Sequence, residues 1–300
     1  MLGVRAAWRK KGVVGKMGKK ICVITGATGG LGFGTAKIMG EKYKLLISDI
    51  NQEKIDKAVS ELKAMGMEAE GMLVDVSKRD EVAALAQKAK NMGTIASVVH
   101  LAGLTGFAGT PELIFRVNTL GAIYINEEFY DVMQPGSAMF NICSSVSYMM
   151  PGDRWPIELF ELCRKEDKEE LYEKMISFFL NENTQHPQGM AYTWSRCFNY
   201  WYIGECTYKF GQKGIRIVGV APGIVETEQS RLDMEKSGSL EPRLTYVAMG
   251  NRMGTIDECA FLISTLVDER NSYVSGIVVP CDGGEIGSGF KGQRTPRAES

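Results

Sequence analysis

Short apolar runs alternate along the chain with longer stretches in which apolar residues recur every three or four positions. The short runs predict strands, at 20–25, 43–48, 68–74, 95–100, 137–143, 215–220 and 276–280. The stretches between the early runs predict helices, at 31–42, 52–65, 78–92 and 112–133. Strand, helix and strand at this spacing form right-handed crossovers, so the pattern predicts a parallel sheet covered by helices on both faces.

The same pattern sets the expected domain boundaries. No linker rich in proline, glycine or serine divides the chain, so we expect one doubly wound α/β domain of about seven strands over 19–284. Residues 1–18 carry five lysines and arginines and lack the long apolar core of a secretory signal. They predict a flexible basic tail, with Met17 as an alternative start, and 285–300 predict a polar tail.

The first predicted strand runs into a glycine-rich turn. Gly26, Gly29 and Gly32 follow the strand and precede a helical pattern. Glycine has no Cβ, so such a turn is tight and lets a pyrophosphate approach the amides of a helix N-terminus. With 34 glycines in the chain, a plain turn is the alternative.

Asp49 ends the next predicted strand, seventeen positions after Gly32. This is close to the ~20-residue distance of the acid that binds an adenosine ribose in dinucleotide-binding folds. A carboxylate there accepts from the 2′-hydroxyl and repels a 2′-phosphate, so Asp49 predicts NAD rather than NADP as the cofactor. The alternative is that Asp49 caps the helix that follows.

Two further strands end in residues that suit a nucleotide. Asp75 and Val76 follow the third strand, and Ala102 and Gly103 follow the fourth. Asp75 predicts either a contact with an adenine amino group or a helix cap before Ser77. The small Ala102-Gly103 pair lets backbone lie flat against a nucleotide, although a simple strand-to-loop exit has the same sequence.

Composition excludes several classes of protein. The chain is 44 % hydrophobic and 24 % charged with a net charge of −1, so it supports a sizeable core and carries no basic stripe for nucleic acid. No run approaches the ~20 apolar residues of a membrane span. Seven cysteines without CxxC spacing and only two histidines predict buried thiols in the cytoplasm and no metal site.

Together these motifs resemble the short-chain dehydrogenase/reductase family over about 19–284. The residues that carry the resemblance are Thr25, Gly26, Gly29, Gly30, Leu31, Gly32, Asp49, Asp75, Ala102, Gly103, Asn118, Ser144, Tyr192, Pro222, Gly223, Val225, Thr227 and Asp282-Gly283-Gly284. The resemblance implies a Rossmann-like fold and an NAD-dependent oxidoreductase. The glycine spacing also fits the longer epimerase branch, but Pro222-Gly223 and Asp282-Gly283-Gly284 favour the short oxidoreductase branch.

The resemblance implies three catalytic roles. Tyr192 transfers the proton between a ketone and an alcohol, and Ser144 donates a hydrogen bond to the substrate oxygen. Asn118 holds a water of the proton path through its backbone carbonyl. Ser144 can instead be a turn serine, and the neighbouring Ser145 and Ser147 leave the register open.

The chain departs from the family at Arg196, where the family has a lysine four positions after the catalytic tyrosine. A phenol ionises poorly near neutral pH, and a cation on the same helix face promotes ionisation. Arginine keeps that charge and can bind both ribose hydroxyls, but it cannot release a proton. Three interpretations follow: an active enzyme with a shifted pH profile, a slow enzyme, or a nucleotide-binding relative that has lost catalysis.

In the family, the segment after the sixth strand binds the nicotinamide carboxamide. The resemblance assigns this role to Pro222-Gly223, the backbone of Val225 and the hydroxyl of Thr227, which fixes the ring face that exchanges hydride. Residues 228–251 are polar and interrupted by glycine and proline, and they correspond to a mobile substrate loop. A plain surface connection is the alternative.

Ser144 and Tyr192 are 48 positions apart, far more than is usual in the family. The extra stretch, about 148–190, holds two amphipathic segments that predict helices at the rim of the active site. It is similar in placement to the insertion of 3α-hydroxysteroid dehydrogenase/carbonyl reductases, which implies a bulky apolar alcohol or ketone such as a steroid or bile acid. The alternative is a helical hairpin used for packing or subunit contact.

The resemblance also bears on assembly. Family members pair through the long helices that bear Asn118 and Tyr192, so a homodimer or homotetramer is expected. The insertion lies between Ser144 and Tyr192 in the sequence and could obstruct one such interface.

Overall fold

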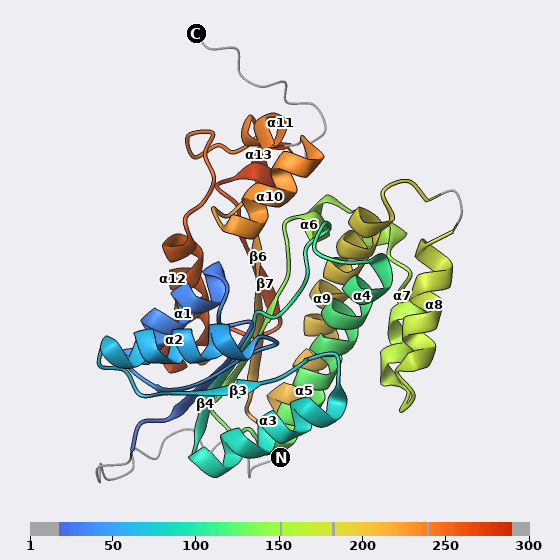
Figure 1. Ribbon diagram of the computed structural model, residues 1–300. Coiled ribbons are helices and arrows are strands. Elements are labelled where there is room, and N and C mark those ends of the chain that lie inside the picture. The colour runs from blue at the N-terminus through green and yellow to red at the C-terminus, as the bar shows by residue number, and fades with distance from the viewer. Residues whose placement is uncertain (1–17, 151, 182–183, 239, 290–300) are drawn as a thin grey trace.

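The computed structural model describes residues 18–150, 152–181, 184–238 and 240–289, and within them seven parallel strands form one sheet (Figure 1). The strand order is β3-β2-β1-β4-β5-β6-β7. The strands are β1 (Ile21–Thr25), β2 (Lys44–Asp49), β3 (Ala69–Leu73), β4 (Ile95–His100), β5 (Ala138–Ile142), β6 (Arg216–Pro222) and β7 (Ile277–Cys281). The predicted parallel α/β sheet is confirmed.

Helices cover both faces of the sheet, so its central strands are buried throughout, as their nearly continuous apolar sequence requires. One face carries α1 (Gly30–Gly40), α2 (Gln52–Ala64) and α12 (Ile256–Val267). The other face carries α3 (Arg79–Met92), α4 (Pro111–Phe115), α5 (Gly121–Val132) and α9 (Pro187–Gln212). Each face has its own apolar core, and the order of the strands brings the ends of β1 and β4 together.

The helix predicted at 112–133 is interrupted in the structure. A π turn, η2 (Arg116–Leu120), separates α4 from α5 and contains Asn118 at its centre. A short amide side chain competes with the helical backbone for hydrogen bonds, and π turns often mark functional positions. The continuous helix predicted at 112–133 is therefore wrong at 116–120, although the helical character of its two ends is confirmed.

The stretch between Ser144 and Tyr192 is helical, as expected. It contains α6 (Val146–Met149), η3 (Gly152–Arg154), α7 (Ile157–Phe160), η4 (Glu161–Arg164) and α8 (Glu169–Phe179). In Figure 1, α7 and α8 lie against the outer side of α4 and α9, away from the sheet. We call 157–179 the outer hairpin.

Aromatic stacking and ion pairs fix the outer hairpin in place. The ring of Phe179 stacks on Trp194 of α9 with centroids 4.6 Å apart, and Phe160 meets Phe198 edge to face at 5.4 Å. Arg116 makes two 2.9 Å hydrogen bonds to the carboxylate of Glu169. The apolar side of the hairpin is thus used for packing, which is the alternative role considered for it, and it covers part of the helix surface expected to mediate pairing.

Two segments predicted as irregular contain helices. The expected substrate loop at 228–251 contains α10 (Glu228–Ser237) and α11 (Leu240–Leu244), because Thr227 accepts from the backbone of Ser230 and caps α10. The expected polar tail at 285–300 begins with α13 (Glu285–Gly289), in which Glu285 is buried. The structure also has η5 (Glu269–Asn271) before β7. The predicted tails at 1–17 and 290–300 lie outside the described residues.

Most cysteine side chains lie inside the protein. Six of the seven cysteines are buried thiols, as the apolar surroundings of these residues predict. No helix in the described ranges has the length and hydropathy needed to cross a bilayer.

Packing of the outer hairpin predicts a stability difference between two phenylalanines. Phe160 is fully buried and Phe178 is 62 % exposed. Phe160→Ala should lower the free energy of unfolding by about 3–5 kcal/mol, because it leaves a cavity against α9. Phe178→Ala should change it by less than about 1 kcal/mol. Urea unfolding followed by tryptophan fluorescence measures both, and equal effects would contradict the observed docking of the hairpin.

His100 couples the ends of two neighbouring strands. Its Nδ1 lies 2.8 Å from the hydroxyl of Thr25, and the side chain is buried between β1 and β4. Burial, and next the cation of Arg196 on α9, lower the pKa of His100 to about 3. The imidazole is therefore neutral at neutral pH.

This lowered pKa predicts a specific acid sensitivity. A histidine in the unfolded chain titrates near ~6.5, so between that pH and about 3 the unfolded state binds the extra proton. The free energy of unfolding is therefore highest above pH 6.5 and falls as the pH is lowered, by about 2 kcal/mol at pH 5.

Urea unfolding at pH 7.5 and pH 5 measures this loss in the free energy of unfolding. The His100→Gln variant should not show the part of the loss that comes from His100. His186→Gln, which changes an exposed histidine, should retain it. Equal pH dependence of His100→Gln and the unaltered protein would refute the assignment.

Candidate functional site

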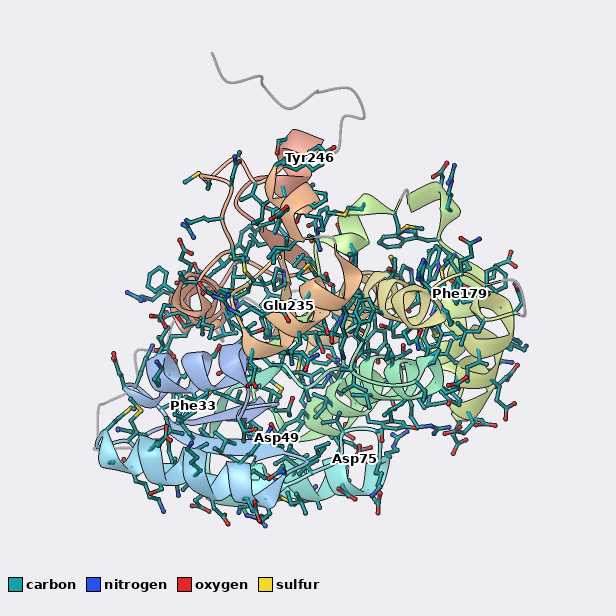
Figure 2. The ribbon with its side chains drawn as sticks, turned by 45° about the horizontal axis from the view of Figure 1, so that its top comes forward. Phe33, Asp49, Asp75, Phe179, Glu235 and Tyr246 are labelled. Atoms are coloured by element: carbon teal, nitrogen blue, oxygen red, sulfur yellow. The ribbon has the colours of Figure 1, made fainter. Side chains whose placement is uncertain are left out.

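The predicted site residues lie where the parallel strands end, at the carboxyl edge of the sheet. Ligands bind at this edge in doubly wound folds because loops from several strands converge there. Figure 2 shows Asp49 and Asp75 below Glu235 of α10, while Phe179 of the outer hairpin lies far to one side. The hairpin therefore does not border the part of the edge where Asp49 and Asp75 lie.

The glycine turn has the geometry that a pyrophosphate cradle needs. Gly26 has a φ of +65°, and a Cβ there would lie 2.7 Å from the Cα of Ala102. A Cβ on Gly32 would lie 2.0 Å from the carbonyl oxygen of Gly26, so both positions require glycine. Gly29 precedes α1 and faces open space, with no atom within 4 Å of an added Cβ. The amides of the first turn of α1, which includes Gly30 and Leu31, are thus approachable.

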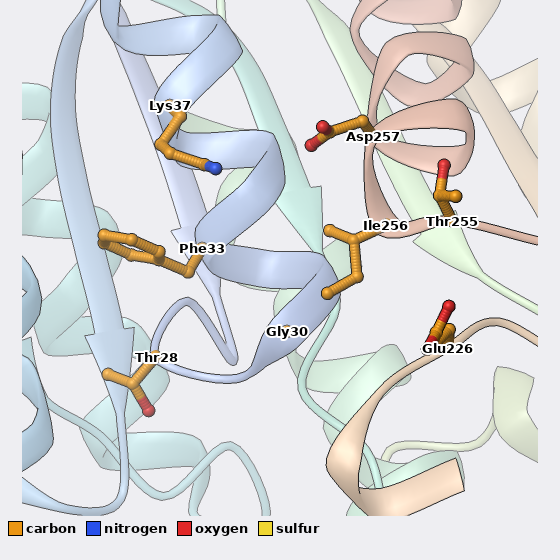
Figure 3. Close-up of a pocket in the computed structure, with 8 residues that line it drawn as sticks. All are labelled: Thr28, Gly30, Phe33, Lys37, Glu226, Thr255, Ile256 and Asp257. Carbon is orange, nitrogen blue, oxygen red and sulfur yellow. The ribbon is translucent and has the colours of Figure 1, made fainter. Parts of the chain in front are cut away.

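A pocket of about 380 Å³ adjoins the glycine turn on its outer side. Figure 3 shows Phe33 and Lys37 of α1 on one side and Asp257 of α12 on the other. Thr28 and Gly30 belong both to this pocket and to the turn. The first turn of α1 can therefore be reached from solvent.

Asp49 is oriented by the glycine turn itself. Its Oδ2 accepts from the hydroxyl of Thr28 at 2.6 Å, and its Oδ1 accepts from the amide of Ile50 at 2.8 Å. The alternative role as a helix cap is wrong, because Asn51 caps α2 by accepting from the amide of Lys54. Thr28 was not among the predicted site residues, although its position inside the glycine turn could have indicated it.

Asp75 mainly organises its own turn. Its Oδ1 accepts from both the amide and the hydroxyl of Ser77, at 3.0 and 2.7 Å. Helix α3 begins later, after Lys78. Val76 is buried against α5, where a Cβ on Gly121 would lie 3.0 Å from its Cγ2. The carboxylate thus has a local role close to the predicted cap, and its second oxygen lies 4.0 Å from Lys78 Nζ.

The loop after β4 is held from two sides. Thr25 Oγ1 accepts from the amide of Ala102 at 3.2 Å. From the other side, the Asn118 amide accepts from the backbone of Leu104 at 2.8 Å and donates back to it at 2.9 Å. Asn118 also donates to the hydroxyl of Ser195 at 3.1 Å. Asn118 therefore positions the loop that contains Ala102 and Gly103, and Ser195 is a partner that sequence patterns did not indicate.

Three neighbouring serines are distinguished by what their hydroxyls contact. Ser147 donates to the carbonyl of Arg196 at 3.0 Å, which ties the serine turn to α9. The hydroxyl of Ser145 lies 3.5 Å from Glu285 Oε2. Ser144 has only a 3.5 Å contact from the amide of Val146. Ser144 is thus the serine of this turn whose hydroxyl has the fewest contacts with protein groups.

Arg196 is a buried cation beside the predicted catalytic tyrosine. Its Cζ lies 5.3 Å from the ring centre of Tyr192, and the residue is 5 % exposed. Its Nη1 donates to the carbonyl of Ile142 at 3.3 Å, whereas its Nε has no partner. Among the described residues no carboxylate neutralises this guanidinium. A buried charge with an unused donor favours an acceptor supplied by a ligand.

The segment after β6 folds back against the glycine turn. A Cβ on Gly30 would lie 2.9 Å from Cγ2 of Thr227, and a Cβ on Gly223 would lie 2.9 Å from the Cα of Asp282. Pro222 accepts from the amide of Ser145 at 2.8 Å, and Val225 forms a bridge with Gly254. These residues therefore line the same edge as Ser144 and the first turn of α1.

The residues at this edge of the sheet fit a bound dinucleotide. The open first turn of α1 suits a pyrophosphate, Asp49 suits a ribose, and the unpartnered Nε of Arg196 suits further hydroxyls. No three histidine, cysteine, aspartate or glutamate side chains gather into a metal-binding group within the described residues.

Comparison with known proteins shows the family of this chain. A family model described as short chain dehydrogenase matches 20–156, and one described as enoyl-(acyl carrier protein) reductase matches 187–285. Together they cover more than half of the chain, and the stretch between them contains the outer hairpin.

Two curated relatives match over nearly their whole length. The short-chain dehydrogenase/reductase bsc3 of Alternaria brassicicola is 27 % identical over 273 residues, covering 90 % of this chain and 97 % of that protein. The 3-oxoacyl-(acyl-carrier-protein) reductase FabG of Thermotoga maritima is 25 % identical over 279 residues, covering 89 % and 98 %.

Solved structures show the same fold. A short-chain type dehydrogenase/reductase from Mycobacterium ulcerans has a TM-score of 0.71 at 19 % identity and covers 90 % of both chains. One from Serratia marcescens has a TM-score of 0.69 at 17 % identity, covering 89 % of this chain and 97 % of that one. The chain belongs to the short-chain dehydrogenase/reductase family of oxidoreductases, which generally bind a nicotinamide cofactor.

Proposed function

We propose that this protein is an NAD-dependent oxidoreductase that interconverts a secondary alcohol and a ketone on a bulky apolar substrate. The observation that carries the proposal is the buried guanidinium of Arg196, which lies beside Tyr192 with its Nε unpartnered. Ser144, whose hydroxyl is little engaged, belongs to the turn that Ser147 ties to the carbonyl of Arg196. The proposed base Tyr192, the oxygen-binding donor Ser144 and the cation of Arg196 thus belong to one connected part of the structure.

Each of these groups has a distinct task in the proposed reaction. Tyr192 gives its hydroxyl proton to the ketone oxygen, or takes the alcohol proton in the reverse direction. Ser144 donates a hydrogen bond to that oxygen while negative charge develops on it. Arg196 stabilises the ionised phenol by its charge and offers its free donor to ribose hydroxyls. A bound nicotinamide supplies the hydride donor or acceptor.

Asp49 supports NAD over NADP. Its carboxylate is held at the end of β2 by Thr28 and Ile50, where it would face an adenosine ribose. A 2′-phosphate there would meet a negative charge that no basic side chain at hydrogen-bond distance offsets in the described part of the chain.

Exposed apolar side chains support a bulky apolar substrate. Phe107, Met149, Met190 and Leu232 are 44, 40, 36 and 44 % exposed. Phe107 follows Gly106, whose added Cβ would lie 3.7 Å from Tyr192 Cβ; Met190 precedes Tyr192 and Met149 follows Ser144 in the chain. Phe107 and Met149 belong to segments around the predicted catalytic pair, whereas the sulfur of Met190 accepts from Nε1 of Trp194 on the side of the outer hairpin, and Leu232 lies on α10. Hydroxysteroids and bile acids are the first substrates to test. The outer hairpin does not contribute to this argument.

Arg196 also favours a second candidate, a nucleotide-binding protein without catalysis. A guanidinium stays protonated and cannot pass a proton onward as a lysine can. In that case NAD would bind while no alcohol or ketone reacts. NAD-linked turnover of a panel that includes hydroxysteroids separates the two candidates, since binding without any turnover selects the second.

The role of Asp49 predicts the cofactor preference of variants. Asp49→Asn should weaken NADH binding about 10- to 100-fold, because a charge-assisted hydrogen bond to the ribose is lost. NADPH binding should improve relative to NADH, since the repulsion of the phosphate is removed. Fluorescence titration of both nucleotides measures this, with Asp56→Asn on the exposed surface of α2 as the control. An unchanged ratio of the two affinities would contradict the role of Asp49.

The role of Arg196 predicts opposite results for two substitutions. Arg196→Met should lower kcat at least about 100-fold, because it removes the cation beside the phenol. Arg196→Lys should keep kcat within about tenfold and move the pH profile, because the charge remains. Tyr192→Phe serves as the inactive reference that still binds NAD. A far larger kcat for Arg196→Lys than for the unaltered protein would instead indicate an enzyme that has decayed.

A further inference from the structure

A buried carboxylate that the proposed mechanism does not use lies beside the serine turn. Glu285 of α13 is 4 % exposed. Its Oε1 accepts from Nε of Arg243 at 2.7 Å, and its Oε2 accepts from Nη2 of the same residue at 2.8 Å. This two-point ion pair joins α13 to α11, although the two residues are 42 positions apart in the chain.

The same ion pair contacts two loops of the site. The hydroxyl of Ser145 lies 3.5 Å from Glu285 Oε2 and 3.4 Å from Arg243 Nη2. On the other side, a Cβ on Gly223 would lie 3.3 Å from Glu285 Oε2. The amide of Ser145 in turn donates to the carbonyl of Pro222 at 2.8 Å. The ion pair is therefore in contact with the residue after Ser144 and with the segment after β6.

Further hydrogen bonds connect the C-terminal segment to the residues after α11. The amide of Met249 donates to the carbonyl of Gly283 at 3.0 Å, and the hydroxyl of Ser288 donates to the carbonyl of Tyr246. Asp282 accepts from the amide of Ile286 at 2.7 Å and so fixes the start of α13. The segment 240–249 is thus attached to 282–288 at several points.

We propose that the Arg243–Glu285 ion pair is a positioning device that sets Ser144 against the substrate oxygen and holds 240–249 over the same site. The carbonyl of Ser144 accepts from the amide of Ser147 at 3.0 Å, but its hydroxyl makes only a 3.5 Å contact. The direction of this hydroxyl therefore depends on how the turn through Ser145 is held. A two-point pair between planar groups fixes direction as well as distance, which suits this task. The inference rests on the proposed alcohol/ketone reaction and adds two residues to it.

A second two-point ion pair offers a matched control. Arg164 of η4 donates to both carboxylate oxygens of Glu205 on α9, at 2.6 and 2.9 Å. This pair is more exposed, with side chains 53 % and 28 % accessible, and it belongs to the packing of the outer hairpin. It has the same chemistry without contact to Ser145 or Gly223.

The test is a double-mutant cycle on NAD-linked turnover. Arg243→Met and Glu285→Gln should each lower kcat about 100-fold, as a misplaced oxygen-binding group does, while the Kd of NADH changes less than about threefold. The double variant should be no worse than either single one, and Arg243→Lys should recover part of the loss. The cycle of Arg164→Met and Glu205→Gln should leave kcat within about twofold. Unchanged kcat in Glu285→Gln, or independent effects of the two changes, would overturn the proposal.

Amide hydrogen exchange provides a readout that does not need turnover. Glu285→Gln should speed exchange in both 144–148 and 240–249, whereas Glu205→Gln should leave both segments unchanged. If the unaltered protein binds NADH but turns over no alcohol or ketone, the proposed function has failed, and exchange still decides whether the pair holds the serine turn. Faster exchange in 240–249 alone would reduce the pair to an anchor of that segment and refute its positioning role.

Discussion

The buried guanidinium of Arg196 is the constraint on which the rest of the site depends. It is anchored by one carbonyl of β5 and lies against the loop after β4, where a Cβ on Gly103 would be 2.6 Å from its Nη2. The same cation contributes to keeping His100 neutral between β1 and β4. A buried charge without a carboxylate partner is costly, and that cost is reduced when a polar ligand meets its unused donor. The loop after β4 and the end of β5 therefore surround a buried cation whose Nε has no protein partner.

Local sequence patterns predicted the sheet and the glycine turn, because the information needed for them lies within a few residues. Strands buried on both faces are continuous apolar runs, and Gly26 and Gly32 are required by contacts inside one turn. The same patterns missed α12, although Thr255 and Glu258 form a capping box that marks its start. They also assigned Glu285 to a polar tail, because its partner Arg243 is distant in sequence and no local pattern indicates that a carboxylate is buried.

An amphipathic pattern predicts a helix but does not predict which neighbouring element its apolar face contacts, as the outer hairpin shows. The sequence places the hairpin between Ser144 and Tyr192, which suggested the rim of the site. Its apolar residues instead meet aromatic partners on α4 and α9, where Phe179 stacks on Trp194 and lies 6.0 Å from Phe115. Large aromatic surfaces contribute more by burial there than at an open rim. The hairpin thus shapes the site indirectly, through the helix that bears Tyr192.

Arginine in the lysine position also limits how a proton can leave the site. In the proposed reaction the guanidinium keeps its protons, so it acts on the phenol of Tyr192 by its charge alone. Ser195 donates to the carbonyl of Tyr192 at 2.8 Å and accepts from the amide of Asn118 at 3.1 Å. The π turn around Asn118 also takes its backbone out of the regular helical hydrogen-bond pattern. Asn118 and Ser195 therefore link the backbone carbonyl of Tyr192 to the loop after β4. They hold the helix that bears Tyr192 in place and do not contact its phenol hydroxyl through these bonds.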